Sequence, residues 1–278
     1  DVLAIAARSG YTGLELFGVP NHLPSHLPEP RVRDARLRCD DLGLKVITLC
    51  TYVGGFAEAS DTEASAELET YRRYVGIANL LGCDLIRLWP DHLGRNLAAP
   101  REDHWLRAAH YLREAADIGL RAGTRVLIEN HKTMTVNVDL SLRLIHLIGR
   151  PNVVFNFDPG NMCLAGEEYG RAAVLCFNQR IGNVQVKEVS PAVATAGSTD
   201  ATLAAGGSYD LLLGEGTIDH QSYLGALAEI GYDGYYMAEC HKTPTAEWPS
   251  DRIAEHESRA LRTLLEQIAA AKRRPTFV

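Results

Sequence analysis

Two short stretches decide the fold: RVLIENH at residues 125–131 and NVVFNFD at residues 152–158. Successive side chains of a β-strand point to opposite faces, so Leu127 and Glu129 share one face of the first stretch. In the second stretch, Asn156 and Asp158 share a face in the same way. The opposite faces are apolar and suited to packing beneath helices. Both stretches therefore predict buried strands whose inner faces become polar toward the C-terminal end.

Similar runs recur along the chain and alternate with longer amphipathic segments. Strands are predicted at 12–17, 45–52, 84–89, 125–131, 152–158, 182–189 and 234–240. Helices are predicted at 31–42, 61–82, 102–123, 138–150, 167–180, 219–231 and 250–273. This alternation is typical of a parallel sheet covered by helices, and we expect one domain over residues 1–278, a TIM (β/α)8-type barrel of the α/β class. Residues 1–9 resemble a helix, so the first barrel strand is expected upstream of Asp1, with an open or seven-stranded barrel as the alternative.

Composition narrows the classes of partner. The 278 residues are 46% hydrophobic and carry a formal charge of -7 without a basic cluster. We therefore expect no nucleic-acid or membrane partner, and a small polar or neutral substrate. The six cysteines are scattered singly, as is typical of reduced cytoplasmic thiols, and no leader or run of about 18 apolar residues is present. These features predict a cytoplasmic protein.

Four polar side chains are predicted to converge at one end of the barrel. Glu129, Asp158, Gln185 and Glu239 each lie near the C-terminal end of a different predicted strand, on its inner face. Active sites of TIM barrels lie at this end. Buried carboxylates that lie close together need protons or a cation, and oxygen ligands suit Mn²⁺ or Mg²⁺. We therefore predict a divalent-metal site; for each carboxylate taken singly, the alternative is an ion pair with a neighbouring lysine or arginine.

Other inward-facing residues are predicted to contact substrate. His131 would be a general base or a hydroxyl ligand, or else a rim histidine bonded to a loop. Lys187 would bind an oxyanion, or else form a salt bridge with Glu188 or Glu15. Glu15 and Arg87 are predicted to bind substrate, with a structural pair between them as the alternative. The Ala/Gly/Ser/Thr-rich loop at 190–208 would be a lid or binding loop, or a surface insertion.

A series of short motifs runs through the chain in a fixed order. They are GYTGLEL (10–16), LIENH (127–131), FDPGN (157–161), VQVKE (184–188), GEGTID (214–219), GYDG (231–234) and AE (238–239). In their order and spacing the chain resembles the sugar phosphate isomerase/epimerase superfamily of xylose isomerase-like TIM barrels, over nearly its whole length. The resemblance implies that Glu129, Asp158, Gln185 and Glu239 hold a metal, Mn²⁺ first, with Mg²⁺ or Co²⁺ as alternatives. It also implies a homo-oligomer, with a hetero-oligomer as the alternative.

Two positions depart from the pattern of ketose 3-epimerases in this superfamily. Gln185 lies where those enzymes usually carry histidine, although hydroxypyruvate isomerase-like and some keto-glycoside-acting members carry glutamine. Asn161, predicted to bind substrate, lies where family members tend to have histidine. Residues 190–216 contain no arginine to match the substrate-binding arginine of 3-epimerases. These differences argue against an ordinary free-ketose 3-epimerase.

The leading hypothesis is an isomerase or epimerase of a keto sugar or derivative, such as a 3-keto-glycoside or a hydroxypyruvate-like compound. Glu129 and Glu239 would remove and return a proton through a metal-bound enediolate. The alternative is a metal-dependent lyase, a dehydratase or an enzyme that cleaves 3-keto-C- or O-glycosides, with His131 as base. Gln185, Asn161 and the charge of -7 argue against a zinc-dependent DNA-repair endonuclease. A non-catalytic partner subunit is the remaining alternative.

Overall fold

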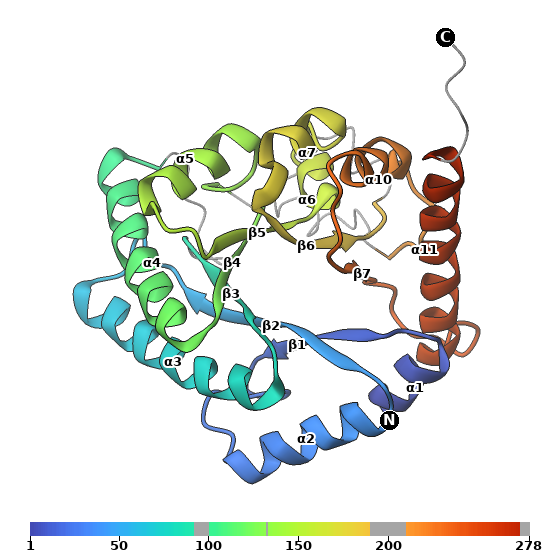
Figure 1. The fold of residues 1–278 in the computed structure, drawn as a ribbon, viewed down its shortest axis with the longest axis horizontal. Coiled ribbons are helices and arrows are strands. Elements are labelled where there is room, and N and C mark those ends of the chain that lie inside the picture. The colour runs from blue at the N-terminus through green and yellow to red at the C-terminus, as the bar shows by residue number, and fades with distance from the viewer. Residues whose placement is uncertain (92–99, 132, 190–209, 273–278) are drawn as a thin grey trace.

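A computed structural model of the chain describes residues 1–91, 100–131, 133–189 and 210–272. Its strands form one parallel sheet in chain order, with helices outside it (Figure 1). The strands are β1 (Gly13–Gly18), β2 (Lys45–Gly54), β3 (Leu85–Trp89), β4 (Arg125–Glu129), β5 (Val153–Phe157), β6 (Ile181–Val186) and β7 (Tyr236–Ala238). The prediction of an α/β barrel of the TIM type is confirmed.

The barrel is nearly closed. Each strand from β1 to β6 pairs in parallel with the next one along the chain, while β1 and β7 are the two ends of the sheet order. Within the described ranges the sheet has seven strands. An eighth strand upstream of Asp1 stays an expectation, and the predicted lid at 190–208 lies outside the described residues apart from its flanks.

The helices follow the predicted alternation, with one addition. They are α1 (Val2–Arg8), α2 (Glu29–Asp41), α3 (Asp61–Leu81), α4 (Glu102–Ala122), α5 (Val138–Ile148), α6 (Pro159–Leu164), α7 (Arg171–Phe177), the 3₁₀ turn η1 (Asn178–Arg180), α10 (His220–Glu229) and α11 (Ser250–Lys272). The single helix predicted at 167–180 is divided between α7 and η1, and α6 was not predicted. Over the described residues, no helix has both the length and the apolar character that a membrane span requires.

Helix ends show why the sequence folds locally as it does. At the start of α3, the Ser60 hydroxyl accepts the Glu63 N–H, and the Glu63 side chain accepts the Ser60 N–H in return. This capping box satisfies amide groups that have no partner within the helix. At the other end, Gly82 adopts a φ of 70°, a left-handed conformation that glycine tolerates best. The chain then turns directly into β3.

The inside and outside of the sheet pack separately. Outward-facing apolar side chains join the helices in one large core, whereas Leu85, Leu127 and Val154 form a small buried cluster of their own. These three residues share the inner face of the sheet with Arg87, Glu129 and Asn156. On each strand the apolar residue precedes the polar one by two positions. The apolar cluster therefore lies nearer the N-terminal ends of the strands, and the polar residues lie nearer their C-terminal ends.

Candidate active site

The four predicted ligand residues lie at the same end of the barrel. Glu129 is the last residue of β4, Gln185 lies in β6, and Asp158 and Glu239 directly follow β5 and β7. Glu129, Asp158 and Gln185 are buried, and the side chain of Glu239 is 20% exposed. The strand register thus brings them to the edge where TIM barrels carry their chemistry.

The ammonium of Lys187 lies among these side chains. Its Nζ is 2.6 Å from Asp158 Oδ2 and 2.9 Å from Glu239 Oε2, and it donates to Asn161 Oδ1 at 2.8 Å. Neither alternative partner suggested by the sequence, Glu188 or Glu15, takes part in these contacts. Glu188 is the next residue along the chain, just beyond β6, and its side chain points the other way. Its Oε2 lies 3.2 Å from His220 Nε2. A role for Lys187 in binding substrate stays a prediction.

Arg87 compensates the charge of Glu129. Its Nη1 lies 2.5 Å from Glu129 Oε2, and both side chains are 3% exposed. Asn156 Nδ2 and Asn161 Nδ2 also donate to the Glu129 carboxylate, at 3.2 and 3.1 Å. The structural alternative of a Glu15–Arg87 pair is therefore replaced by a Glu129–Arg87 pair, and Asn161 connects Glu129 to Lys187.

Glu15 is held by amides. Asn183 Nδ2 donates to its Oε1 at 2.8 Å and Gln185 Nε2 to its Oε2 at 3.1 Å. The other end of the Gln185 amide, Oε1, is buried and has no hydrogen-bond donor among the described residues. Asp158 Oδ2 is buried too and lies 2.6 Å from the Lys187 ammonium. The Gln185 oxygen is thus available to a cation, whereas Asp158 Oδ2 already faces the Lys187 ammonium.

Burial and charge shift the titration of the carboxyl groups. Burial raises the pKa of Glu15 to about 7, although the Gln185 hydrogen bond acts in the opposite direction. Burial likewise raises the pKa of Asp158 to about 7, against the effect of Lys187. For Glu239 burial is outweighed by the Lys187 charge and the His241 contact at 3.5 Å, so its pKa is lowered. One ammonium cannot neutralise two carboxylates, and the deeper Asp158 is the one that retains a proton more readily.

An aromatic wall, defined here as Phe17, Tyr52 and Trp89, lies on the β1–β3 side. The rings of Phe17 and Tyr52 stack with centroids 6.5 Å apart, and those of Tyr52 and Trp89 at 6.2 Å. The Arg87 guanidinium lies 4.7 to 5.7 Å from the three ring centroids. Strand alternation places Phe17 on the same face as Glu15, two residues further on, so the sequence carries a signal for this ring, although no aromatic wall was predicted from it.

His131 lies just beyond β4, and not within a strand as predicted. Its ring packs edge-on against Trp89 with centroids 5.4 Å apart, and the backbone N–H of His131 donates to Thr135 Oγ1 at 3.2 Å. The histidine is half-buried at the rim, beside the aromatic wall. This contact agrees with the rim position considered in the sequence, and its role as a base stays a prediction.

The donor chemistry fits a divalent cation, but the donors are not gathered around one point. Among the described residues, no three His, Cys, Asp or Glu side chains form a group that could hold a metal ion. Lys187 provides positive charge between Asp158 and Glu239 instead. The side-chain oxygens of Gln185 and Asp158 are nevertheless hard donors of the kind that Mn²⁺ and Mg²⁺ prefer. Glu129, Asp158, Gln185 and Glu239 are the residues that would hold the ion.

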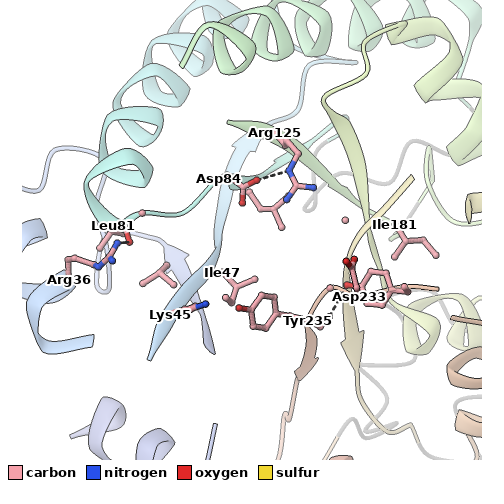
Figure 2. Close-up of a pocket in the computed structure, with 15 residues that line it drawn as sticks. Arg36, Lys45, Ile47, Leu81, Asp84, Arg125, Ile181, Asp233 and Tyr235 are labelled. Carbon is pink, nitrogen blue, oxygen red and sulfur yellow. Dashed lines mark hydrogen bonds and ion pairs between the residues drawn. The ribbon is translucent and has the colours of Figure 1, made fainter. Parts of the chain in front are cut away.

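Two cavities adjoin different parts of the barrel. One of about 510 Å³ is lined by residues at the strand starts, including Lys45, Asp84 and Arg125, and contains none of the predicted site residues (Figure 2). The other, of about 560 Å³, lies between β1 and β7 and includes Glu15 and Glu239 in its lining. Of these two cavities, the second has site carboxylates in its lining.

One comparison with known proteins matches about half of the chain. The inosose dehydratase of Lacticaseibacillus casei is 26% identical over 155 residues, which cover 53% of this chain and 51% of that protein. The chain spans about half the length of the curated relatives it matches.

Solved structures share the fold over nearly the whole chain. L-ribulose 3-epimerase matches with a TM-score of 0.77 and 20% identity over 99% of this chain and 92% of its own. The IOLI protein with a bound zinc atom matches with a TM-score of 0.80 and 15% identity, over 96% and 92%. The probable 3-DHS dehydratase AsbF of Bacillus anthracis matches at 0.74 and 19%, over 94% and 92%. At these identities the likeness establishes the fold.

The motif series had indicated a resemblance to xylose isomerase-like barrels, and a family model tests it directly. The model described as "Xylose isomerase-like TIM barrel" matches residues 3–264, which is nearly the whole of the 278-residue chain. The chain therefore belongs to the xylose isomerase-like TIM barrel family.

Proposed function

We propose that the protein is a divalent-metal-dependent isomerase or epimerase of a keto sugar or sugar derivative, with a 3-keto-glycoside or a hydroxypyruvate-like compound as substrate. The observation that carries this proposal is the pair of carboxylates Glu129 and Glu239 at one barrel end: Glu129 ends β4 and Glu239 directly follows β7, with β5 and β6 between those two strands. Two such groups can serve the opposite faces of one substrate carbon. The family includes enzymes of this type, such as the similar L-ribulose 3-epimerase.

Glu129, Asp158, Gln185 and Glu239 would hold the metal, for which Mn²⁺ is our first expectation and Mg²⁺ or Co²⁺ the alternatives. When bound, a divalent cation polarises a substrate carbonyl and stabilises the negative charge that develops on its oxygen. The zinc atom bound in the similar IOLI structure supports a metal-dependent protein here.

The chain's own carboxylates would move the proton. The lowered pKa of Glu239 keeps it ionised at neutral pH, and its partial exposure in the cavity between β1 and β7 lets it reach a substrate carbon. Glu129 is fixed by Arg87 and two asparagine amides, so its oxygens are oriented before substrate arrives. One carboxylate removes the proton and the other returns it, to the opposite face for epimerisation or to the neighbouring carbon for isomerisation.

Other side chains would bind and orient the substrate. Lys187 and Asn161 present an ammonium and an amide beside the carboxylates, suited to a developing oxyanion. Tyr52 is 50% exposed within the aromatic wall, and an exposed ring of this kind packs well on the apolar face of a sugar ring. The mixed lining of charged groups on one side and rings on the other supports a carbohydrate ligand.

A lyase is the second candidate. The similarity to inosose dehydratase over about half the chain favours elimination of water from a keto polyol. In that reaction, or in cleavage of a 3-keto-C- or O-glycoside, His131 would be the base. Its half-buried position at the rim beside Trp89 leaves the ring near the mouth of the barrel, where a leaving group would depart.

Product analysis in D₂O tests the proposal. Mn²⁺-loaded protein is incubated with a panel of keto sugars and 3-keto-glycosides and followed by NMR. Deuterium at the carbon next to the carbonyl of recovered or isomerised sugar is expected, whereas release of water or aglycone without exchange would favour the lyase. Glu239→Gln should lower the rate by roughly 10²–10⁴-fold, and exposed Glu255→Gln should leave it unchanged. No turnover of any panel member, or equal rates for both variants, contradicts the proposal.

We also propose a homo-oligomer, with a hetero-oligomer as the alternative, and no nucleic-acid or membrane partner. The net charge of -7 supports the absence of nucleic acid. Sedimentation of the purified chain should show a dimer or tetramer, and a monomer at micromolar concentration would contradict this expectation.

A further inference from the structure

The Lys187 ammonium lies where a cation is needed. Three oxygens surround it, from Asp158, Glu239 and Asn161, at 2.6, 2.9 and 2.8 Å. Two of these belong to residues that would hold the metal. The lysine side chain is 5% exposed, so this arrangement is a built part of the barrel interior and not a chance surface contact.

The fold makes room for this lysine. A Cβ on Gly160, the second residue of α6, would lie 2.7 Å from Lys187 Cγ and 2.8 Å from Cε. Only glycine therefore allows the methylene chain of Lys187 to lie across the start of α6 and reach Asp158. The position of the ammonium thus depends on a backbone feature outside the carboxylates themselves.

Ammonium and divalent ion compete for the same oxygens. A metal ion held by Asp158 and Glu239 would use the same oxygens that Nζ now contacts, and two cations that share these oxygens in a buried site would repel each other strongly. The finding that no three ligand-type side chains among the described residues share a metal-sized space agrees with this competition. One positive centre can occupy the position at a time.

We propose that the Lys187 ammonium and a divalent metal ion occupy the Asp158–Glu239 position alternately, so that Lys187 must leave this position for the metal to bind. The inference rests on the proposed metal-dependent function and adds a specific device to it. In the unloaded protein Lys187 neutralises the carboxylates and keeps the site folded, at the expense of metal affinity. On loading, the displaced ammonium becomes available to a substrate oxyanion.

The test is direct Mn²⁺ binding by calorimetry and by EPR of the free ion, with Lys187→Met compared with wild type. The matched control is Lys45→Met, which makes the same substitution and charge change at the opposite end of the barrel (Figure 2). Lys187→Met should bind Mn²⁺ at least tenfold more tightly than wild type and the control. In EDTA it should melt at a lower temperature than both, because the carboxylates have lost their counter-ion. Mn²⁺ should restore its melting temperature.

Two further measurements keep the inference testable if Lys187→Met folds poorly. Lys187→Gln retains a donor toward Asn161 without the charge and should also bind Mn²⁺ more tightly. Crystals of wild type with and without Mn²⁺ should show Nζ out of contact with Asp158 only when metal is bound. The inference is overturned if either charge-removing variant binds Mn²⁺ no better than wild type, or if Nζ still contacts Asp158 beside bound metal. If wild type and variants alike bind no Mn²⁺, the proposed metal dependence fails together with it.

Discussion

Replacing Arg87 with methionine would remove the cation that faces Glu129. Methionine fills much of the same volume between the three rings of the aromatic wall, so the main change is electrostatic. The Glu129 carboxylate would stay buried, at 3% exposure, with only the amides of Asn156 and Asn161 as hydrogen-bond donors. The folded state must then hold an uncompensated charge or take up a proton.

The expected cost follows from that geometry. Removing one partner of a buried ion pair typically destabilises a protein by about 3–5 kcal/mol. Because two amides still donate to Glu129, the lower end of this range, about 3 kcal/mol, is expected. For a chain of this size that corresponds to a fall in melting temperature of roughly 6–12 °C.

Urea denaturation and thermal unfolding at pH 7 in EDTA give the measurement without metal linkage. The control is Arg171→Met, which breaks an ion pair with Glu229 whose side chains are 59% and 50% exposed and should cost less than about 1 kcal/mol. Adding Glu129→Gln to Arg87→Met should recover part of the loss, because the unpaired charge is then absent. A loss no greater than the control, or no recovery in the double variant, would refute this account of Arg87.

Three further predictions concern stability. Burial raises the pKa of Asp91 from its ordinary 3.8 to about 6, so the protonated carboxyl favours folding below pH 4 and this contribution to stability is lost as the pH rises through 6. In urea titrations, the stability of Asp91→Asn relative to wild type should therefore increase by up to about 3 kcal/mol between pH 4 and pH 7. A difference that stays constant over this range would contradict the pKa shift. Gly54→Ala should destabilise the protein by more than about 2 kcal/mol, since the φ of Gly54 is 151° and the new Cβ would lie 2.1 Å from the Trp89 carbonyl oxygen. Gly76→Ala, within α3, should stabilise it by up to about 1 kcal/mol, because the new Cβ would meet no atom within 4 Å. Equal melting temperatures for the two variants would contradict this packing. Ser60→Ala should cost about 1 kcal/mol by loss of the α3 cap, and unchanged thermal unfolding would show that the cap contributes nothing.

Strand alternation accounts for most of what the sequence predicted. Because the side-chain period of a strand is two residues, one inward residue fixes the others on the same strand. This is why Glu129, Gln185 and Lys187 were assigned to the barrel interior, and why Asp158 and Glu239 were placed at the same end. Strand ends were predicted less accurately: β7 stops at Ala238, before Glu239, and β4 stops before His131. Pairing depends on the neighbouring strand, which a single run of sequence does not contain.

Partner choice inside the barrel could not be predicted. Alternation gives the face of a residue, but not how far its side chain reaches across the lumen. From alternation alone, Arg87 could pair with Glu15 as well as with Glu129, whereas the structure shows the pair with Glu129. The long side chain of Lys187 reaches Asp158, which directly follows the neighbouring strand β5. These contacts depend on the curvature of the closed sheet and on the space beside Gly160. Helix α6 is different: Asp158 followed by Pro159 is a helix-start signal, but six residues are too few to show a helical period.

The two oxygens of Asp158 have different partners, so its structural role and its chemical role can be separated by mutation. Oδ1 accepts the Asn161 N–H at 3.1 Å and caps α6, while Oδ2 faces the Lys187 ammonium. An asparagine there keeps an acceptor for the helix and removes the charge, whereas an alanine removes both. A displacement of this carboxylate therefore also displaces the start of α6 and Asn161, the third residue of that helix. Exchange of the ligand at Asp158 and movement of this short helix are thus coupled.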